Sequence, residues 1–151
     1  GEGSTFRIYL PAEAGRIRKK TRVKGDLFVH NKTVLIIEDD PVVRAIAGEI
    51  LSGLGYRVLE AEDGDDGLQV YNRNKDEIDV ILLDMVMPKM NGREVFEELM
   101  TLDPHVKVVF SSGFSHDRGF HELMEKGARG FIQKPYRQQE LGRVIKEALK
   151  S

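Results

Sequence analysis

The chain has 151 residues, of which 40% are hydrophobic and 32% charged, with a formal net charge of −2. This is enough for one domain with a real core, and the composition excludes a disordered chain. The absence of cysteine excludes a disulfide framework and a thiolate metal site. No apolar run approaches the roughly 20 residues that span a bilayer, so a membrane anchor would lie outside this sequence.

The first 32 residues carry a charge balance of +5 and the remaining residues a balance of −7. The sequence of residues 1–11 predicts a glycine-rich loop followed by an alternating strand that stops at Leu-Pro. A single strand cannot bury its own apolar side, so we expect it to belong to a neighbouring domain. We interpret residues 12–31, with the basic run 16–24, as a solvated linker and expect no nucleic-acid partner.

The body of the chain, residues 32–151, alternates strands and helices five times. We expect buried strands at 33–37, 56–61, 79–83, 106–110 and 129–133. We expect helices at 41–53, 65–74, 91–102 and 116–126, and a last one after Pro135. Strands that alternate with helices at this spacing predict a doubly wound α/β fold with a parallel sheet.

Local signals fix two of the helix starts. Asp40 is an expected N-cap before Pro41, a favoured first helical residue. Asn91 and Glu94 have the spacing of a capping box. The first helix carries large apolar residues at three- and four-residue spacing, which predict its apolar face: Val42, Val43, Ile46, Ile50 and Leu54.

Polar side chains follow several of the strands. Right-handed crossovers place the carboxyl ends of all parallel strands at one edge of the sheet. If the strand order is the flavodoxin-like 2-1-3-4-5, then Glu38, Asp39 and Asp84 converge at the switch point between the first and third strands. Ser112 and Lys134 reach the same edge from the fourth and fifth strands.

Three carboxylates this close repel one another unless a cation lies among them. An oxygen-only cluster favours Mg²⁺, which also leaves positions for water and phosphate oxygens. Asp84 could then attack phosphorus as a carboxylate nucleophile. The Lys134 ammonium and the Ser112 hydroxyl would stabilise the equatorial oxygens of the phosphoryl group.

Residues 32–150 resemble a response-regulator receiver domain. The resemblance is carried by motifs that follow the strands: Glu38-Asp39, Leu83-Asp84-Met85-Val86-Met87-Pro88 with Asn91-Gly92, Ser112-Gly113 and Lys134-Pro135. It departs from the family pattern where Glu38 replaces an Asp and Ser112 replaces a Thr.

The resemblance implies a role for each matching residue. Asp84 would be the phosphoacceptor, and Lys134 the lysine that contacts the phosphoryl group. Ser112 and Phe131 would form the conformational switch. The implied Mg²⁺ ligands are Glu38 (through water), Asp39, Asp84 and the backbone carbonyl of Val86.

Residues 1–11 resemble the end of the ATP-binding catalytic domain of sensor histidine kinases, in which a Gly-x-Gly-Ser/Thr-x-Phe segment leads into the last strand. Eleven residues cannot bind ATP. Together with the receiver resemblance, this segment leads us to interpret the chain as the C-terminal receiver of a hybrid sensor histidine kinase. We expect the receiver to lie in the cytoplasm, even if the parent kinase is anchored in a membrane. It would accept a phosphoryl group from a phosphohistidine, on its own kinase or on a phosphotransfer domain. It would catalyse its own phosphorylation and dephosphorylation without being a kinase.

Three alternatives stay open. The chain could be a stand-alone single-domain regulator whose first thirty residues are an extension. It could be a Mg²⁺-dependent aspartyl-phosphate phosphatase, although that class expects a second acid two residues beyond Asp84, where this chain has Val86. It could be a receiver that only binds proteins, which the loss of an acid or of Lys134 would have favoured.

Overall fold

The computed structural model describes residues 8–9, 31–113 and 119–151. Most of the predicted kinase tail, and all of the predicted linker except Asn31, lie outside these ranges. The strands are β1 (Ile8–Tyr9), β2 (Thr33–Ile37), β3 (Arg57–Ala61), β4 (Val80–Asp84), β5 (Val108–Ser112) and β6 (Gly130–Gln133). The helices are α2 (Pro41–Gly53), α3 (Gly64–Asn74), α4 (Gly92–Leu102), α5 (Phe120–Glu125) and α6 (Gln138–Lys150).

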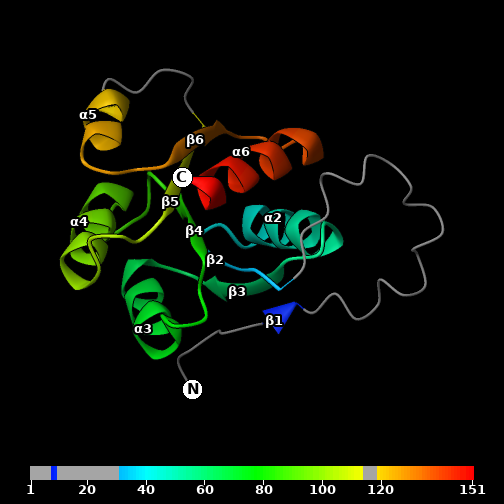
Figure 1. Cartoon of the computed structure of the whole chain (residues 1–151), viewed down its shortest axis with the longest axis horizontal. Coiled ribbons are helices and arrows are strands. Elements are labelled where there is room, and N and C mark those ends of the chain that lie inside the picture. The colour runs from blue at the N-terminus through cyan, green and yellow to red at the C-terminus, as the bar shows by residue number, and fades with distance from the viewer. Residues whose placement is uncertain (1–7, 10–30, 114–118) are drawn as a thin grey trace.

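The sheet has the order β1-β3-β2-β4-β5-β6 (Figure 1). Strands β2 to β6 are parallel, and their order confirms the predicted flavodoxin-like 2-1-3-4-5 topology. In β1, Ile8 and Tyr9 pair antiparallel with β3. We expected this strand to need the sheet of another domain, and its pairing here differs from that expectation. The edge of β3 offers unpaired backbone groups, which is the physical reason that an extended segment can pair there.

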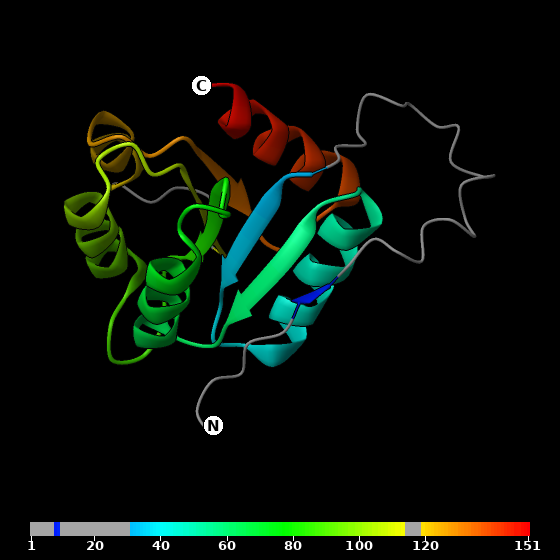
Figure 2. The same cartoon turned by 60° about the horizontal axis from the view of Figure 1, so that its bottom comes forward.

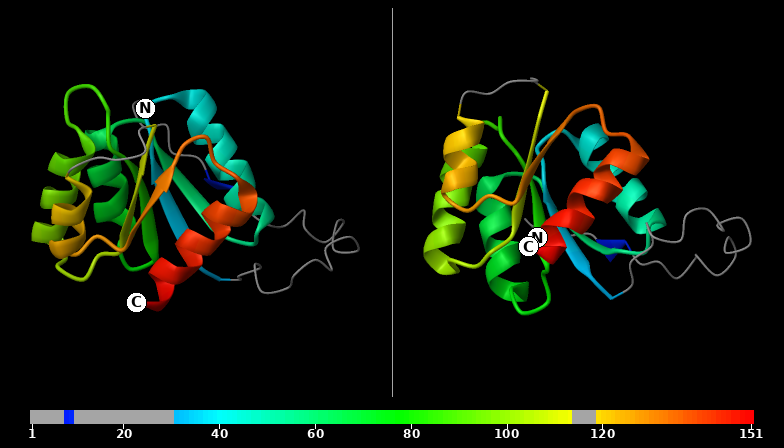
Figure 3. Two further views of the ribbon diagram at one scale, coloured as in Figure 1. Left: turned by 90° about the horizontal axis from the view of Figure 1, so that it is seen from above. Right: turned by 45° about the horizontal axis from the view of Figure 1, so that its top comes forward.

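Helices cover both faces of the sheet, as Figures 1 and 2 show. Alternate residues of the strands point to opposite faces, so each strand contributes to two cores. One core lies under α3, α4 and α5, and the other lies under α2 and α6 (Figure 3). Within the described residues, no helix is both long and apolar enough to cross a membrane.

Helix α2 buries only part of the apolar face that we predicted, because Leu54 is buried and Ile50 packs against the core. Val42 and Ile46 are 65% and 45% exposed, whereas Ala47, Gly48 and Leu51 are buried. Small residues allow the helix to approach the sheet closely, and a count of large apolar side chains misses such a face. Strand β5 also begins later than predicted, because Val106 lies in a turn in which its N–H donates to the carbonyl of Asp103.

The two predicted helix starts are confirmed. The Asp40 carboxylate accepts from the N–H groups of Val42 and Val43, at 2.9 and 3.3 Å. Asn91 and Glu94 form both hydrogen bonds of the capping box. Helix α4 then begins against the end of β4, where a Cβ atom on Gly92 would lie 2.3 Å from the carbonyl oxygen of Asp84. Only glycine allows this approach, and the approach sets the backbone that carries Asp84.

The substitution Gly92→Ala should therefore lower the free energy of unfolding by about 1–3 kcal/mol, the usual range for an overpacked site. Gly53→Ala is the matched control, because a Cβ at that helical position meets nothing within 4 Å. It should leave stability unchanged or raise it slightly. Urea unfolding of both variants measures the difference, and equal stabilities would contradict the proposed close approach.

Candidate functional site

Three carboxylates meet at the carboxyl edge of the sheet. Asp84 ends β4, and Glu38 and Asp39 directly follow β2, the neighbouring parallel strand. One carboxylate oxygen from each residue lies within 4.8 Å of the others. Glu38 and Asp84 are buried, whereas Asp39 is half-buried. The structure thus brings together the three acids that the sequence predicts.

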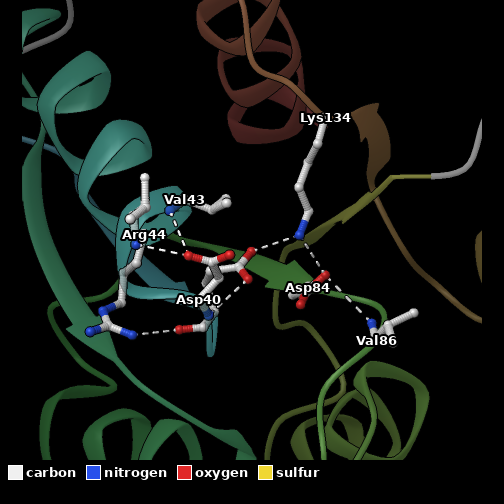
Figure 4. Close-up of polar contacts among 8 residues, drawn as sticks. Asp40, Val43, Arg44, Asp84, Val86 and Lys134 are labelled. Carbon is white, nitrogen blue, oxygen red and sulfur yellow. Dashed lines mark hydrogen bonds and ion pairs between the residues drawn. The ribbon is translucent and has the colours of Figure 1, made fainter.

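Lys134 lies between two of these acids. Its Nζ atom is 2.9 Å from Oε1 of Glu38 and 3.0 Å from Oδ1 of Asp84 (Figure 4). The lysine follows β6, and its N–H donates to the carbonyl of Ser112 over 2.8 Å. The Lys134–Pro135 peptide bond is cis. The ammonium group therefore reaches the acids from a loop that is tied to the end of β5.

Backbone groups hold the loop that carries the first two acids. The N–H of Glu38 donates to the carbonyl of Ala61 over 3.2 Å. The N–H of Asp40 donates to Oε2 of Glu38, also over 3.2 Å. At the neighbouring strand, the N–H of Val86 lies 3.4 Å from Oδ1 of Asp84. Both buried carboxylates are thus oriented by the chain around them.

Burial changes the pKa values of the site. Burial raises the pKa of Glu38 from 4.5 to about 7; the hydrogen bond from Lys134 acts against the rise, and the charge of Asp84 adds to it. Burial also raises the pKa of Asp84, again against the Lys134 hydrogen bond. For Lys134, burial acts to lower the pKa, but its bonds to Glu38 and Asp84 outweigh burial and raise it. Three carboxylates face one lysine, so the site carries excess negative charge when all three acids are ionised.

A divalent cation fits these residues. The donor set consists of carboxylate oxygens, which are hard ligands that suit Mg²⁺. The three oxygens are close enough to share one ion, and among these residues only Lys134 brings a positive charge to them. The backbone carbonyl of Val86 stays a predicted ligand.

The two predicted switch residues lie on β5 and β6. Ser112 is the last residue of β5 and is buried. Phe131 is half-buried, and its ring centroid lies 4.9 Å from that of Phe120, the first residue of α5. Phe131 thus contacts the first residue of α5, and its switching role stays a prediction.

Sequence reasoning missed Arg44 on α2 and Glu60 on β3, which lie beside the site. Nη1 of Arg44, on α2, donates to the carbonyl of Glu38 over 2.8 Å (Figure 4). Nε of Arg44 lies 3.4 Å from Oε1 of Glu60, on β3. The helical position of Arg44 carried no signal of this contact, because the contact depends on how α2 is rotated against the sheet.

A doubly wound sheet with acids and a lysine at its switch point defines a class of α/β domains whose chemistry lies at the carboxyl edge. Residues 34–146 match the model of the response regulator receiver domain. The chain belongs to this family. It is therefore a receiver domain of two-component signalling, which confirms the predicted family, fold and function.

Several known proteins are similar to the chain. The sensor kinase CckA of Brucella abortus is 31% identical over 99% of this chain and 17% of its own length. The chemotaxis protein CheY of Thermotoga maritima is 33% identical over 70% of this chain and 87% of its own. A receiver domain from Clostridium thermocellum has a TM-score of 0.75 and 28% identity, over 79% of this chain and 94% of that chain.

The chain thus spans less than a fifth of the length of the Brucella kinase. Receiver domains of hybrid kinases receive phosphoryl groups from histidine-containing domains, and family members typically bind Mg²⁺ through acidic residues. The stand-alone regulator and the phosphatase have no better support among the relatives, which include another sensor kinase, the autoinducer 1 sensor kinase/phosphatase LuxN of Vibrio campbellii.

The raised pKa of Glu38 predicts a pH dependence for the metal-free protein. Between pH 4.5 and pH 7 the folded state holds a proton that the unfolded state has released. The free energy of unfolding should therefore fall as pH rises through this range, by about 3 kcal/mol. Urea unfolding in a chelator at several pH values measures the slope. Glu38→Gln cannot titrate and should have a flatter profile; an identical slope in both proteins would contradict the assignment to Glu38.

Proposed function

We propose that Asp84 accepts a phosphoryl group from a phosphohistidine. The observation that carries this proposal is the meeting of three carboxylates, within 4.8 Å of one another, with the Lys134 ammonium 3.0 Å from Asp84. A buried carboxylate at the end of a strand, beside a fixed cation, is a preorganised nucleophile.

The proposed transfer is a displacement at phosphorus. A carboxylate oxygen of Asp84 forms a bond to phosphorus as the bond between phosphorus and the imidazole nitrogen breaks. The electron pair of that bond returns to the imidazole ring, which carries a proton on its other nitrogen before the transfer and therefore leaves as neutral imidazole. Lys134 neutralises charge on the phosphoryl oxygens, and the Ser112 hydroxyl donates to one of them.

Glu38, Asp39, Asp84 and the Val86 carbonyl would hold Mg²⁺. When bound, the ion neutralises negative charge on the phosphoryl oxygens and offsets the repulsion among the acids. Because Lys134 now bridges Glu38 and Asp84, we infer that it turns toward the phosphoryl group when the acids have another cation. Ser112 would then move toward the phosphoryl group, and Phe131 would fill the space that it leaves.

We further propose that the chain is the C-terminal receiver of a hybrid sensor kinase in the cytoplasm. The similarity to the Brucella sensor kinase supports this, because that alignment covers 99% of the chain and so includes its first thirty residues. Residues 1–11 would be the end of the ATP-binding domain, residues 12–31 a basic linker, and residues 32–151 the receiver.

Exposed apolar side chains beside the acidic site suit a protein donor. Val42 and Ile46 lie four residues apart on α2 and share one face of the helix. Val86, two residues after Asp84, is 64% exposed. We propose that these side chains contact the domain that carries the phosphohistidine and bring its imidazole to Asp84.

Phosphorylation by a small donor tests the acceptor. Intact-mass analysis after incubation with acetyl phosphate and Mg²⁺ should show one phosphoryl adduct, which is lost in a chelator. Asp84→Asn should abolish it, because an amide oxygen is a poor nucleophile. Asp65→Asn, at an exposed position of α3, is the control and should keep the adduct. A full adduct on Asp84→Asn would refute the assignment.

The apolar surface formed by Val42, Ile46 and Val86 is tested by comparing a protein donor with a small-molecule donor. Ile46→Glu should slow transfer from a phosphohistidine domain by about tenfold or more, because a charge would be buried in the contact. The same variant should accept from acetyl phosphate at the wild-type rate. Leu102→Glu is the control. It introduces a charge at a similarly exposed residue, at the end of α4 that lies away from Asp84, and it should change neither rate. Equal slowing with both donors would instead indicate damage to the site.

A further inference from the structure

Both peptide groups that flank Glu38 are held from outside the loop. The preceding one donates its N–H to Ala61, and the following one accepts from Nη1 of Arg44 through its carbonyl (Figure 4). Because a peptide group is planar, holding both groups fixes the two backbone dihedrals of Glu38. The carbonyl bound by Arg44 belongs to the peptide that joins Glu38 to Asp39. Its orientation therefore decides where both carboxylates point.

Arg44 is itself held in place. Its Nε atom faces the Glu60 carboxylate, and the two side chains are only 13% and 3% exposed. Glu60 lies on β3, opposite Ile36 of β2, one strand away from the loop that carries the acids. Its second oxygen, Oε2, is buried without a hydrogen-bond partner in the described part of the chain.

Stability alone is a weak explanation for this pair. Replacing a buried ion pair by apolar residues is often neutral or stabilising, because the desolvation of the charges offsets their attraction. The unpartnered oxygen of Glu60 adds to that desolvation. The guanidinium, by contrast, is a rigid fork of donors that can hold two acceptors at fixed angles. Here those acceptors are the Glu60 carboxylate and the Glu38 carbonyl.

We propose that Arg44, anchored by Glu60, is a positioning residue for the cation site. It sets the peptide between Glu38 and Asp39 so that both carboxylates meet Asp84 around one divalent ion. This inference rests on the proposed function, since it assumes that the three acids bind Mg²⁺. Arg44 also links β3 to the site, because a displacement of Glu60 would release the Arg44 guanidinium from the carbonyl of Glu38.

Direct titration with Mg²⁺ tests the inference. Isothermal titration calorimetry should show that Arg44→Gln binds Mg²⁺ about tenfold more weakly, as for other residues that orient metal ligands. Arg44→Lys keeps the charge but loses the fork, so it should restore little of the affinity. Arg57→Gln is the control, because Arg57 pairs with Glu77 on the surface. Its affinity should equal that of the wild type.

A second measurement separates positioning from a merely structural role. In the metal-free protein, Arg44→Gln should speed hydrogen exchange at the amide of Glu38, which donates to the carbonyl of Ala61, while the amides of β4 stay protected. At saturating Mg²⁺, phosphorylation of Arg44→Gln by acetyl phosphate should return to the wild-type rate.

Glu60→Gln is a milder change that should also weaken Mg²⁺ binding. If Arg44→Gln does not fold, the Mg²⁺ affinity of Glu60→Gln tests the positioning role instead.

The possible outcomes separate a failure of the positioning role from a failure of the proposed function. If the wild type binds Mg²⁺ and both Arg44→Gln and Glu60→Gln bind it equally well, the positioning role is wrong and the proposed function stands. Full rescue of affinity by Arg44→Lys would also overturn the inference, because charge alone would then suffice. If the wild type neither binds Mg²⁺ nor accepts a phosphoryl group, the proposed function itself fails.

Discussion

The repulsion among three carboxylates at one edge of the sheet governs this domain. The fold brings Glu38, Asp39 and Asp84 together because β2 and β4 are neighbours in a parallel sheet. Lys134 neutralises part of their charge. Burial raises the pKa of Glu38 to about 7, and the charge of Asp84 adds to this rise. A site that retains excess negative charge attracts a cation, and that cation in turn attracts phosphate oxygens. The proposed chemistry follows from this one electrostatic constraint.

The rest of the structure holds the acids in place, and burying them lowers the stability of the domain. A buried, charged cluster destabilises a domain unless its members are oriented and paired. Helix α4 begins against Asp84, and this close approach requires Gly92. Arg44 donates a hydrogen bond to the carbonyl of Glu38, which we propose orients the other two acids. Two large cores, one on each face of the sheet, supply the stability that the edge lacks.

The sequence predicted the parallel sheet, its order and the acids of the site, because strand-end residues are fixed by topology alone. Capping also followed from short-range spacing, as at Asn91. The sequence predicted only part of the buried face of α2, since Ala47 and Gly48 pack closely where larger residues were expected. The Arg44 contact was missed for the same reason, because it joins elements whose relative rotation no local pattern encodes. The pairing of β1 with β3 is likewise a long-range contact.

The most direct measurement locates the acyl phosphate on the unmodified chain. After incubation with acetyl phosphate and Mg²⁺, borohydride reduces an aspartyl phosphate to homoserine with loss of phosphate, and peptide mass analysis then finds the altered residue. The account predicts homoserine at position 84, and none when a chelator removes Mg²⁺. Homoserine at another aspartate, or an unaltered Asp84 in a protein that has taken up phosphate, would contradict it.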